Sequence, residues 1–180
     1  LRTHPMNIRT SDTIAAIATP SGEGAIAVIR VSGPDAIAIG DKVFRSRRAL
    51  SAAGSHTVHH GVIVTRQGEV VDEVLATVFR APRSYTGEDV LEISCHGGIL
   101  VTGAVLETML DAGARQADPG EFTRRAFLNG KMDLSRAEAV AGLITSASDR
   151  ARRASVEQLR GRLAATVEEI RGAMTRLCAL

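Results

Sequence analysis

The segment TIAAIATPSGEGAIAVIRVS, residues 13–32, decides the fold of this chain. Its first part, Thr13–Thr19, is a continuous apolar run of the kind that forms a buried strand. The turn that follows, Pro20–Gly24, contains two glycines, which permit a positive φ. Residues 25–32 are rich in β-branched side chains, which favours a second strand. The segment therefore predicts two consecutive strands joined by a glycine-containing turn.

The same turn carries the spacing Gly22-x-Gly24-x-x-Ala27, which superficially matches a dinucleotide-binding fingerprint. That fingerprint requires the glycines to open a helix whose N-terminal amides hold a pyrophosphate. Here a strand-forming segment follows the glycines, so we interpret the turn as a connection between strands. The alternative, for this turn and for the pair Gly97-Gly98, is that the glycines let the backbone approach a ligand closely.

The rest of the first 132 residues alternates strand and helix signals. We predict a helix over about 34–45, a surface loop over 46–56, a hairpin of 58–66 with 70–80, a polar loop over 81–89, a strand over 90–96, a helix over 99–112, a helical turn over 118–127 and a tight loop at 129–131. This order predicts an α+β domain with a mixed sheet of around five strands and two main helices, and argues against an all-parallel doubly wound sheet.

After residue 132 the composition becomes typical of helices. Residues 133–180 contain no proline and are rich in Ala, Arg, Glu and Leu. Ser135-x-x-Glu138 has the pattern of a capping box. From Val156 onward the spacing of apolar residues predicts one helix with a single apolar stripe, formed by Leu159, Leu163, Val167, Ile170, Met174 and Leu177. Such a stripe needs a partner helix, so we expect either a truncated chain or helices that dimerise.

These signals divide the chain into three parts. Residues 1–12 begin with Leu1 and are expected to be a disordered or non-native lead. Residues 13–118 form the predicted α+β domain. Residues 119–180 form the predicted helical arm.

Composition excludes several classes of protein. Of the 180 residues, 44% are hydrophobic and 23% are charged, which is ordinary for a globular protein. The net charge of +2 is lower than the strongly positive charge expected of a dedicated nucleic-acid binder. No apolar run approaches the ~20 residues that span a bilayer. The two cysteines cannot form a disulfide framework or a zinc site by themselves. We expect no membrane association and a reducing, cytoplasmic location.

Three charged residues lie in positions where a charged side chain is unusual. Arg30 interrupts the apolar strand AIAVIRVS, Glu92 lies within VLEISCH, and Lys131 follows Gly130 in a short loop. Such side chains can simply point into solvent. The alternative is that all three line one cavity, where the carboxylate would meet the N–H-rich edge of a heterocycle and the cations would meet carboxylates at the ligand's other end.

Other reactive side chains give weaker signals, and we predict neither a catalytic nor a metal-binding residue. Cys95 and His96 are neighbours on a predicted strand and so point to opposite faces, which favours a structural role over nucleophilic catalysis. The segment Leu128–Lys131 lacks the glycines and hydroxyl of a phosphate-binding P-loop. A metal site is disfavoured at a histidine cluster without a nearby carboxylate partner, His56, His59 and His60.

Three longer motifs occur together: TPSGEGAIAVIRVSG (19–33), SYTGEDVLEISCHGG (84–98) and DPGEFTRRAFLNGKMDLSRAEAV (118–140). In this order they resemble the N-terminal part of the MnmE (TrmE) family of tRNA-modification GTPases, over roughly residues 13–180. The resemblance implies an N-terminal domain related to folate-dependent aminomethyltransferases, followed by the start of a helical domain. It also implies that the folate contacts lie at Arg30, Glu92 and Lys131, with Glu92 favoured for the pterin edge.

The resemblance further implies an activity and partners. The family binds a 5-formyl-tetrahydrofolate-type one-carbon carrier, forms a homodimer through its N-terminal domain and acts with the flavoprotein MnmG. Together they add an aminomethyl-type group to carbon 5 of the wobble uridine in tRNA. The family's GTPase domain, with its GTP, magnesium and potassium sites, is expected beyond Leu180, so these residues alone should not hydrolyse GTP.

Two alternatives stay open. One is an independent folate-dependent transferase, for which the sequence offers no clear acidic catalytic base. The other is a stand-alone RNA-binding module that contacts phosphates through a basic helix face, for which a solvated face is the simpler interpretation: Arg150, Arg152, Arg153, Arg160 and Arg162.

Overall fold

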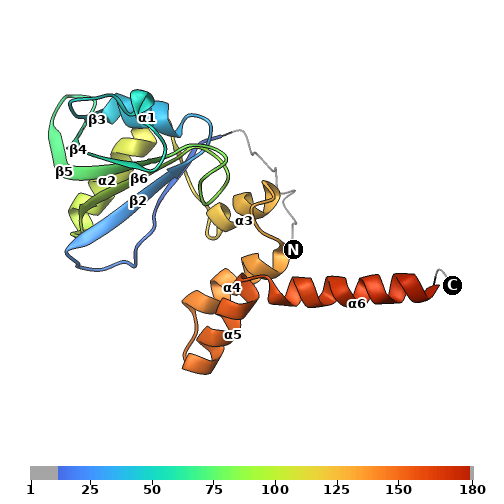
Figure 1. Cartoon of the computed structure of the whole chain (residues 1–180). Helices are drawn as coiled ribbons and strands as arrows, with labels where there is room; N and C mark the ends of the chain where they lie inside the picture. The colour runs from blue at the N-terminus through green and yellow to red at the C-terminus, as the bar shows by residue number, and fades with distance from the viewer. Residues whose placement is uncertain (1–11, 179–180) are drawn as a thin grey trace, which may run out of the picture. The chain divides into compact units, whose positions relative to one another are not determined.

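The computed structural model describes residues 12–178, without the side chains of 163–165, 177 and 178 (Figure 1). The chain forms two compact units that divide between Arg125 and Ala126. We call the part up to Arg125 the sheet unit and the part from Ala126 the helical unit. The prediction for residues 1–12 falls almost entirely outside the described residues.

The sheet unit is built on a mixed sheet of seven strands in the order β3-β4-β5-β6-β2-β1-β7. Its neighbouring strands are antiparallel except for the parallel pair β1–β7. The α+β class predicted from the sequence is therefore confirmed. The strands are β1 (Ile14–Ile17), β2 (Ile26–Ser32), β3 (Phe44–Arg45), β4 (Thr57–Val64), β5 (Val70–Phe79), β6 (Val90–His96) and β7 (Arg115–Gln116).

The prediction of around five strands missed β3 and β7. Each of these strands has only two residues, too few for any alternation of apolar and polar side chains to show in the sequence. Residues 13–32 contain β1 and β2, which pair directly. The glycines between them lead into a strand rather than a helix, as the interpretation of the turn required.

Two helices cover one face of the sheet, α1 (Ala36–Val43) and α2 (Ile99–Asp111) (Figure 1). Their apolar side chains form one core with every second residue of the central strands, including Ile29, Val31, Leu91 and Ile93. Because side chains alternate along a strand, the residues between these point to the opposite face. We call that opposite face the outer face.

The segment 46–56 is more than the surface loop predicted from its composition. It contains a short 3₁₀ turn, Leu50–Ala52, and the side chain of Leu50 is completely buried in the core. The backbone N–H groups of Leu50 and Ser51 donate to the carboxylate of Asp41 at 2.6 and 3.0 Å. The buried side chain of Leu50 and the carboxylate of Asp41 thus hold the segment 46–56 in place, although its composition is typical of a variable loop.

The helical unit holds α4 (Leu134–Ile144), α5 (Asp149–Leu159) and α6 (Arg162–Cys178), while α3 (Glu121–Leu128) begins in the sheet unit. The prediction of one continuous helix from Val156 is wrong, because α5 ends at Leu159. Gly161 takes a φ of +79°, a left-handed conformation that ends a helix. The described side chains of the expected stripe that lie on α6 are more than half exposed: Val167, Ile170 and Met174.

The cap of α4 also differs from the prediction. Asp133, not Ser135, occupies the N-cap, and its carboxylate accepts the backbone N–H of Arg136 at 2.8 Å. Ser135 instead accepts hydrogen bonds from the side-chain amide of Gln158. Both residue types suit an N-cap, so the pattern alone could not choose between them. No helix within residues 12–178 is long and apolar enough to cross a lipid bilayer.

Candidate functional site

Arg30 and Glu92 lie opposite each other on the outer face, as register partners of the antiparallel strands β2 and β6. Nε and Nη2 of Arg30 donate to the same carboxylate oxygen, Oε1 of Glu92, at 2.8 and 2.6 Å. The two side chains are 24% and 25% exposed. The structure therefore brings together two of the three predicted site residues, as a partly buried ion pair that solvent still reaches.

Two aromatic residues that no sequence motif had indicated cover Arg30. The guanidinium carbon lies 5.1 Å from the ring centroid of Tyr85 and 5.5 Å from that of Phe122, within the range of cation–π attraction. Tyr85 comes from the loop between β5 and β6, and Phe122 from the first turn of α3. The Tyr85 hydroxyl hydrogen-bonds Thr123 at 2.8 Å, which joins the two segments.

The geometry of the pair leaves an acceptor and a donor available. Among the described residues, Oε2 of Glu92 and Nη1 of Arg30 take part in no hydrogen bond. A carboxylate oxygen beside a fixed guanidinium can accept from one group of a ligand while the guanidinium donates to another. This arrangement suits a planar heterocycle that carries N–H donors and a carbonyl on one edge.

A second polar group lies two residues further along β2. Ser32 is fully buried, and its hydroxyl donates to Glu88 at 2.7 Å and hydrogen-bonds Thr86 at 2.7 Å. These bonds tie the loop that carries Tyr85 to the strand that carries Arg30. The loop is therefore attached on the same face as the Arg30–Glu92 pair.

Five charged residues form what we call the ionic cluster: Asp12, Glu88, Arg115, Glu121 and Arg125. Arg125 is 1% exposed, and its guanidinium reaches the carboxylates of Asp12 at 2.5 Å, Glu121 at 3.2 Å and Glu88 at 3.3 Å. Arg115 adds a bond of 2.7 Å to Glu121. The cluster thus joins Asp12, two residues before β1, to the β5–β6 loop, β7 and α3.

The charge of Glu121 is strongly stabilised although its side chain is buried. Burial alone would raise its pKa, but hydrogen bonds from Arg115, from the backbone N–H of Asp118 and from Arg125 outweigh that effect. The pKa of Glu121 consequently falls from its ordinary 4.5 to about 2. The cluster therefore holds ionised groups at neutral pH.

Lys131, the third predicted site residue, belongs to the helical unit. It lies in the short connection between α3 and α4, as predicted, and its backbone N–H donates to the carbonyl of Ala126 at 2.8 Å. Its contact with the same ligand as Arg30 and Glu92 stays a prediction.

The first of the two glycines after β6, Gly97, has a structural explanation. Gly97 exchanges backbone hydrogen bonds with the β1–β2 turn, accepting from Gly24 at 3.0 Å and donating to Ala25 at 3.3 Å. A Cβ on Gly97 would lie 2.5 Å from the carbonyl oxygen of Gly24, which is too close. A close approach of two backbone segments, rather than of a ligand, therefore accounts for glycine at this position.

Cys95 and His96 point to opposite faces, as predicted. Cys95 is 3% exposed in the core, and burial, with the charge of Asp72 adding to it, raises the pKa of its thiol. The ring of His96 is exposed and hydrogen-bonds Asp72 at 2.8 Å. A buried neutral thiol and a histidine on the other side of the strand cannot act as a nucleophile and its base.

The expectation that the histidine cluster lacks a nearby carboxylate is wrong for His60. His60 does have a carboxylate neighbour, since its Nε2 lies 2.7 Å from Glu73 on the adjacent strand β5. His60 and Glu73 are far apart in the sequence, and only the pairing of β4 with β5 brings them close together, so the contact could not be predicted from the sequence. Even so, no three such side chains in the described part of the chain are arranged to hold a metal ion.

Most arginines of the predicted basic face, which the structure divides between α5, its C-cap and the start of α6, pair with nearby acidic residues. Arg152 and Arg153 both bond to Asp149, and Arg160 and Arg162 both bond to Glu157. Exposed pairs of this kind are typical of a solvated helix surface. This geometry gives no particular support to the RNA-binding alternative.

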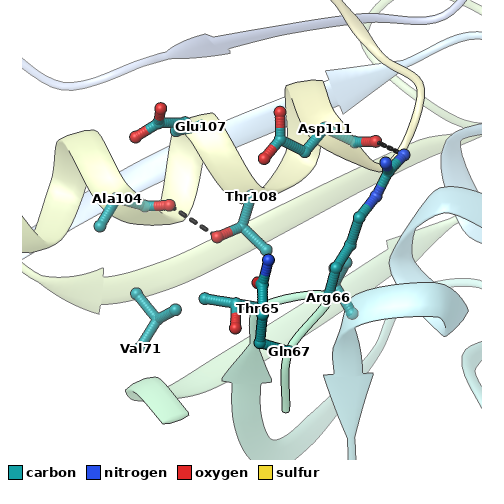
Figure 2. A pocket seen from close by; sticks show the side chains of 9 residues that line it. Thr65, Arg66, Gln67, Val71, Ala104, Glu107, Thr108 and Asp111 are labelled. Atoms are coloured by element: carbon teal, nitrogen blue, oxygen red, sulfur yellow. Dashed lines mark hydrogen bonds between the residues drawn. The ribbon is translucent and has the colours of Figure 1, made fainter. Parts of the chain in front are cut away.

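A cavity of about 210 Å³ lies between the β4–β5 turn and α2, on the helix-covered side (Figure 2). Arg66 donates to the carbonyl of Asp111 and the Thr108 hydroxyl to the carbonyl of Ala104, so these polar groups already have partners within the chain. The cavity lies on the other face of the sheet from the Arg30–Glu92 pair. The bond from Arg66 satisfies the backbone carbonyl of Asp111, the last residue of α2.

Comparisons with known proteins agree with the fold and with the motifs. Residues 13–131 match the family described as "GTP-binding protein TrmE N-terminus", a range that includes Arg30, Glu92 and Lys131. A tRNA modification GTPase MnmE from Bacillus subtilis is 55% identical over 163 residues, which cover 89% of this chain and 36% of that protein.

Proteins of the same name occur in other bacteria. The one from Salinibacter ruber is 55% identical over 170 residues, covering 94% of this chain and 37% of the relative. The one from Symbiobacterium thermophilum is 54% identical over 170 residues, covering 93% and 37%. The chain thus spans little more than a third of the length of these relatives.

Proposed function

This chain belongs to the family of the GTP-binding protein TrmE N-terminus, and from that premise we propose that it is the reduced-folate-binding and dimerising part of a tRNA modification GTPase. The observation that carries the proposal is the Arg30–Glu92 pair on the outer face. Its ligand would be a 5-formyl-tetrahydrofolate-type one-carbon carrier.

The residues of the pair suit a reduced pterin. The edge of a pterin carries N–H donors beside a carbonyl oxygen, which matches the available Oε2 of Glu92 and Nη1 of Arg30. A planar ring system also fits beside the rings of Tyr85 and Phe122. Lys131 would contact the carboxylates at the other end of the folate, for which an ammonium group is well suited.

Titration of the 180-residue protein with 5-formyl-tetrahydrofolate tests this proposal. We expect saturable binding that Glu92→Gln weakens about tenfold or more, because the substitution replaces an ionised acceptor by a neutral amide. Glu73→Gln is the matched control, since Glu73 is an exposed carboxylate on the neighbouring strand β5 and pairs with His60. Absence of binding by the folded protein, or equal affinity in both variants, would contradict the proposal.

The dimer would form through the outer face. Three large apolar side chains are exposed there: Ile26 at 67%, Val58 at 58% and Leu75 at 45%. The strand register places them on the same face as Arg30 and Glu92.

Light scattering tests this dimer. The measured mass should be twice that of one chain, and Leu75→Glu should lower the measured mass. The exposed Val167→Glu on α6 serves as control, and a dimer that survives Leu75→Glu but not Val167→Glu would refute this face.

The remaining functions belong to the whole protein. We propose that it acts in the cytoplasm with the flavoprotein MnmG and adds an aminomethyl-type group to carbon 5 of the wobble uridine in tRNA. GTP hydrolysis, with its magnesium and potassium ions, would reside outside these 180 residues, whose sequence contains no GxxxxGK[ST] motif. A GTPase assay on this chain should therefore show no activity above background.

A further inference from the structure

The two aromatic residues on Arg30 come from segments outside the sheet. Tyr85 lies in the loop between β5 and β6, and Phe122 lies in the first turn of α3. Neither segment has a ladder of strand hydrogen bonds that would fix it over β2. Something else must hold both rings at 5.1 and 5.5 Å from the guanidinium.

The loop is held at its end by Glu88. One carboxylate oxygen of Glu88 accepts from Ser32 on β2 at 2.7 Å, and the other accepts from Arg125 at 3.3 Å. The Ser84 hydroxyl donates to the carbonyl of Glu88 at 2.6 Å, which closes the loop around Tyr85. Glu88 therefore links the loop both to the strand of Arg30 and to α3.

Helix α3 is held by the same guanidinium. Arg125 donates to Glu121 one turn earlier, to the carbonyl and carboxylate of Asp12, and to Glu88. Phe122 and Thr123 lie between Glu121 and Arg125, so the residues that contact Arg30 and Tyr85 are bracketed by the ionic cluster. One buried side chain thus connects both aromatic segments.

Stability alone is a weak explanation for this cluster. Buried ion pairs lose their hydration, and apolar replacements of similar volume are often as stable or more stable. Nε of Arg125 is buried and forms no hydrogen bond within the described residues, which is a further cost. What the charged cluster provides, and an apolar one would not, is a fixed relative position of three segments through directional bonds.

We propose that Arg125 is a positioning residue for the Arg30–Glu92 site. Through Glu88 and Glu121 it holds Tyr85 and Phe122 against the guanidinium of Arg30, and so keeps Arg30 oriented towards the ligand. Arg125 itself does not contact the ligand. The part of this inference that concerns ligand affinity rests on the proposed function; the part that concerns the mobility of Arg30 does not.

The first test uses the ligand-free protein. Hydrogen exchange of the Arg30 Nε–H, followed by NMR, should become about tenfold faster in Arg125→Gln, because the cover of Tyr85 and Phe122 loosens. Backbone amides of β2 and β6 should exchange as before. Arg152→Gln, which removes an exposed arginine paired with Asp149, is the matched control and should change neither rate. Unchanged Arg30 exchange, or an equal acceleration of the strand amides, would overturn the proposal.

Arg125→Gln removes a buried charge and could unfold the sheet unit. Glu88→Gln is therefore measured as well, because it keeps the shape of Glu88 and its bond from Ser32 while losing the charge that faces Arg125. It should give the same selective loosening of Arg30. If both variants fold and neither changes the exchange at Arg30, the positioning role is refuted.

The second test is a double-mutant cycle on the affinity for 5-formyl-tetrahydrofolate. Glu88→Gln and Phe122→Leu should each weaken binding about tenfold, and the double variant should lose little more, because both act through the orientation of Arg30. Additive losses would show independent effects and would count against the proposal. If the wild-type protein does not bind the folate while the exchange at Arg30 still responds to Arg125→Gln, the proposed function fails and the positioning role stands.

Discussion

Arg30 and Glu92 are direct cross-strand partners, and the guanidinium gives both of its hydrogen bonds to one oxygen of the carboxylate. The pair is therefore asymmetric: Oε1 of Glu92 and two nitrogens of Arg30 bond each other, while Oε2 of Glu92 and Nη1 of Arg30 are available to a ligand. Arginine–carboxylate pairs are frequently bidentate and use both carboxylate oxygens, whereas this pair uses only one. This asymmetry underlies the first prediction.

Arg30→Lys should weaken binding of 5-formyl-tetrahydrofolate by about tenfold or more. A lysine keeps the charge, but it cannot bond Glu92 through two nitrogens, stack on Tyr85 and Phe122, and present a further N–H to a ligand. Calorimetric titration measures the effect. Arg45→Lys, at an exposed arginine of β3, is the control, and equal affinities of the two variants would show that the fork geometry of Arg30 is unimportant.

Acid should destabilise the protein through Glu121. Its pKa is about 2 in the folded chain against an ordinary 4.5, so its contribution to the free energy of unfolding is complete above pH 4.5 and is lost as the pH falls towards 2. The difference between these pKa values corresponds to about 3 kcal/mol. Urea unfolding across this range should show a steeper loss of stability in the wild type than in Glu121→Gln. Parallel profiles would contradict the assignment.

Cys95 should be unreactive in the folded protein. Burial in the core raises the pKa of the thiol and keeps reagents away from it. In the variant Cys178→Ser, which leaves Cys95 as the single thiol, a thiol reagent should label the native protein slowly and the urea-unfolded protein rapidly. Fast labelling without denaturant would show that the strand β6 opens readily.

Gly97→Ala should destabilise the sheet unit by about 1–3 kcal/mol, because the new methyl group overlaps backbone atoms that cannot easily move. A Cβ at this position would lie 2.5 Å from the carbonyl oxygen of Gly24. Gly98→Ala is a stringent control, since a Cβ on Gly98 meets no atom within 4 Å. Thermal unfolding of the two variants should therefore differ clearly, and similar midpoints would refute the packing argument.

Local patterns predicted most of the sheet unit. The β-branched segment at residues 25–32 forms β2, and the predicted hairpin forms β4 and β5. Local patterns gave wrong predictions where a single residue determines where a helix begins or ends. Gly161 ends α5 although the apolar spacing continues past it, and Asp133 rather than Ser135 caps α4. Such choices depend on competition between nearby alternatives of similar energy.

The candidate site was only partly visible in the sequence. Arg30 and Glu92 stood out because charges interrupt apolar strands, but their direct pairing follows from the register of β2 and β6, 62 residues apart. Tyr85 and Phe122 were not predicted. They lie in a polar loop and a charged helical turn, and nothing in these local sequences indicates that both rings contact Arg30 of β2. Long-range contacts of this kind are set by tertiary packing, which local pattern does not encode.

The two ends of the sheet, β3 and β7, are strands of only two residues each. β3 pairs only with Val62 and Ile63 of β4, although β4 is eight residues long, so within the described part of the chain most of β4 has a strand partner on one side only. A strand of another molecule could add at this edge, where backbone N–H and C=O groups face away from β5.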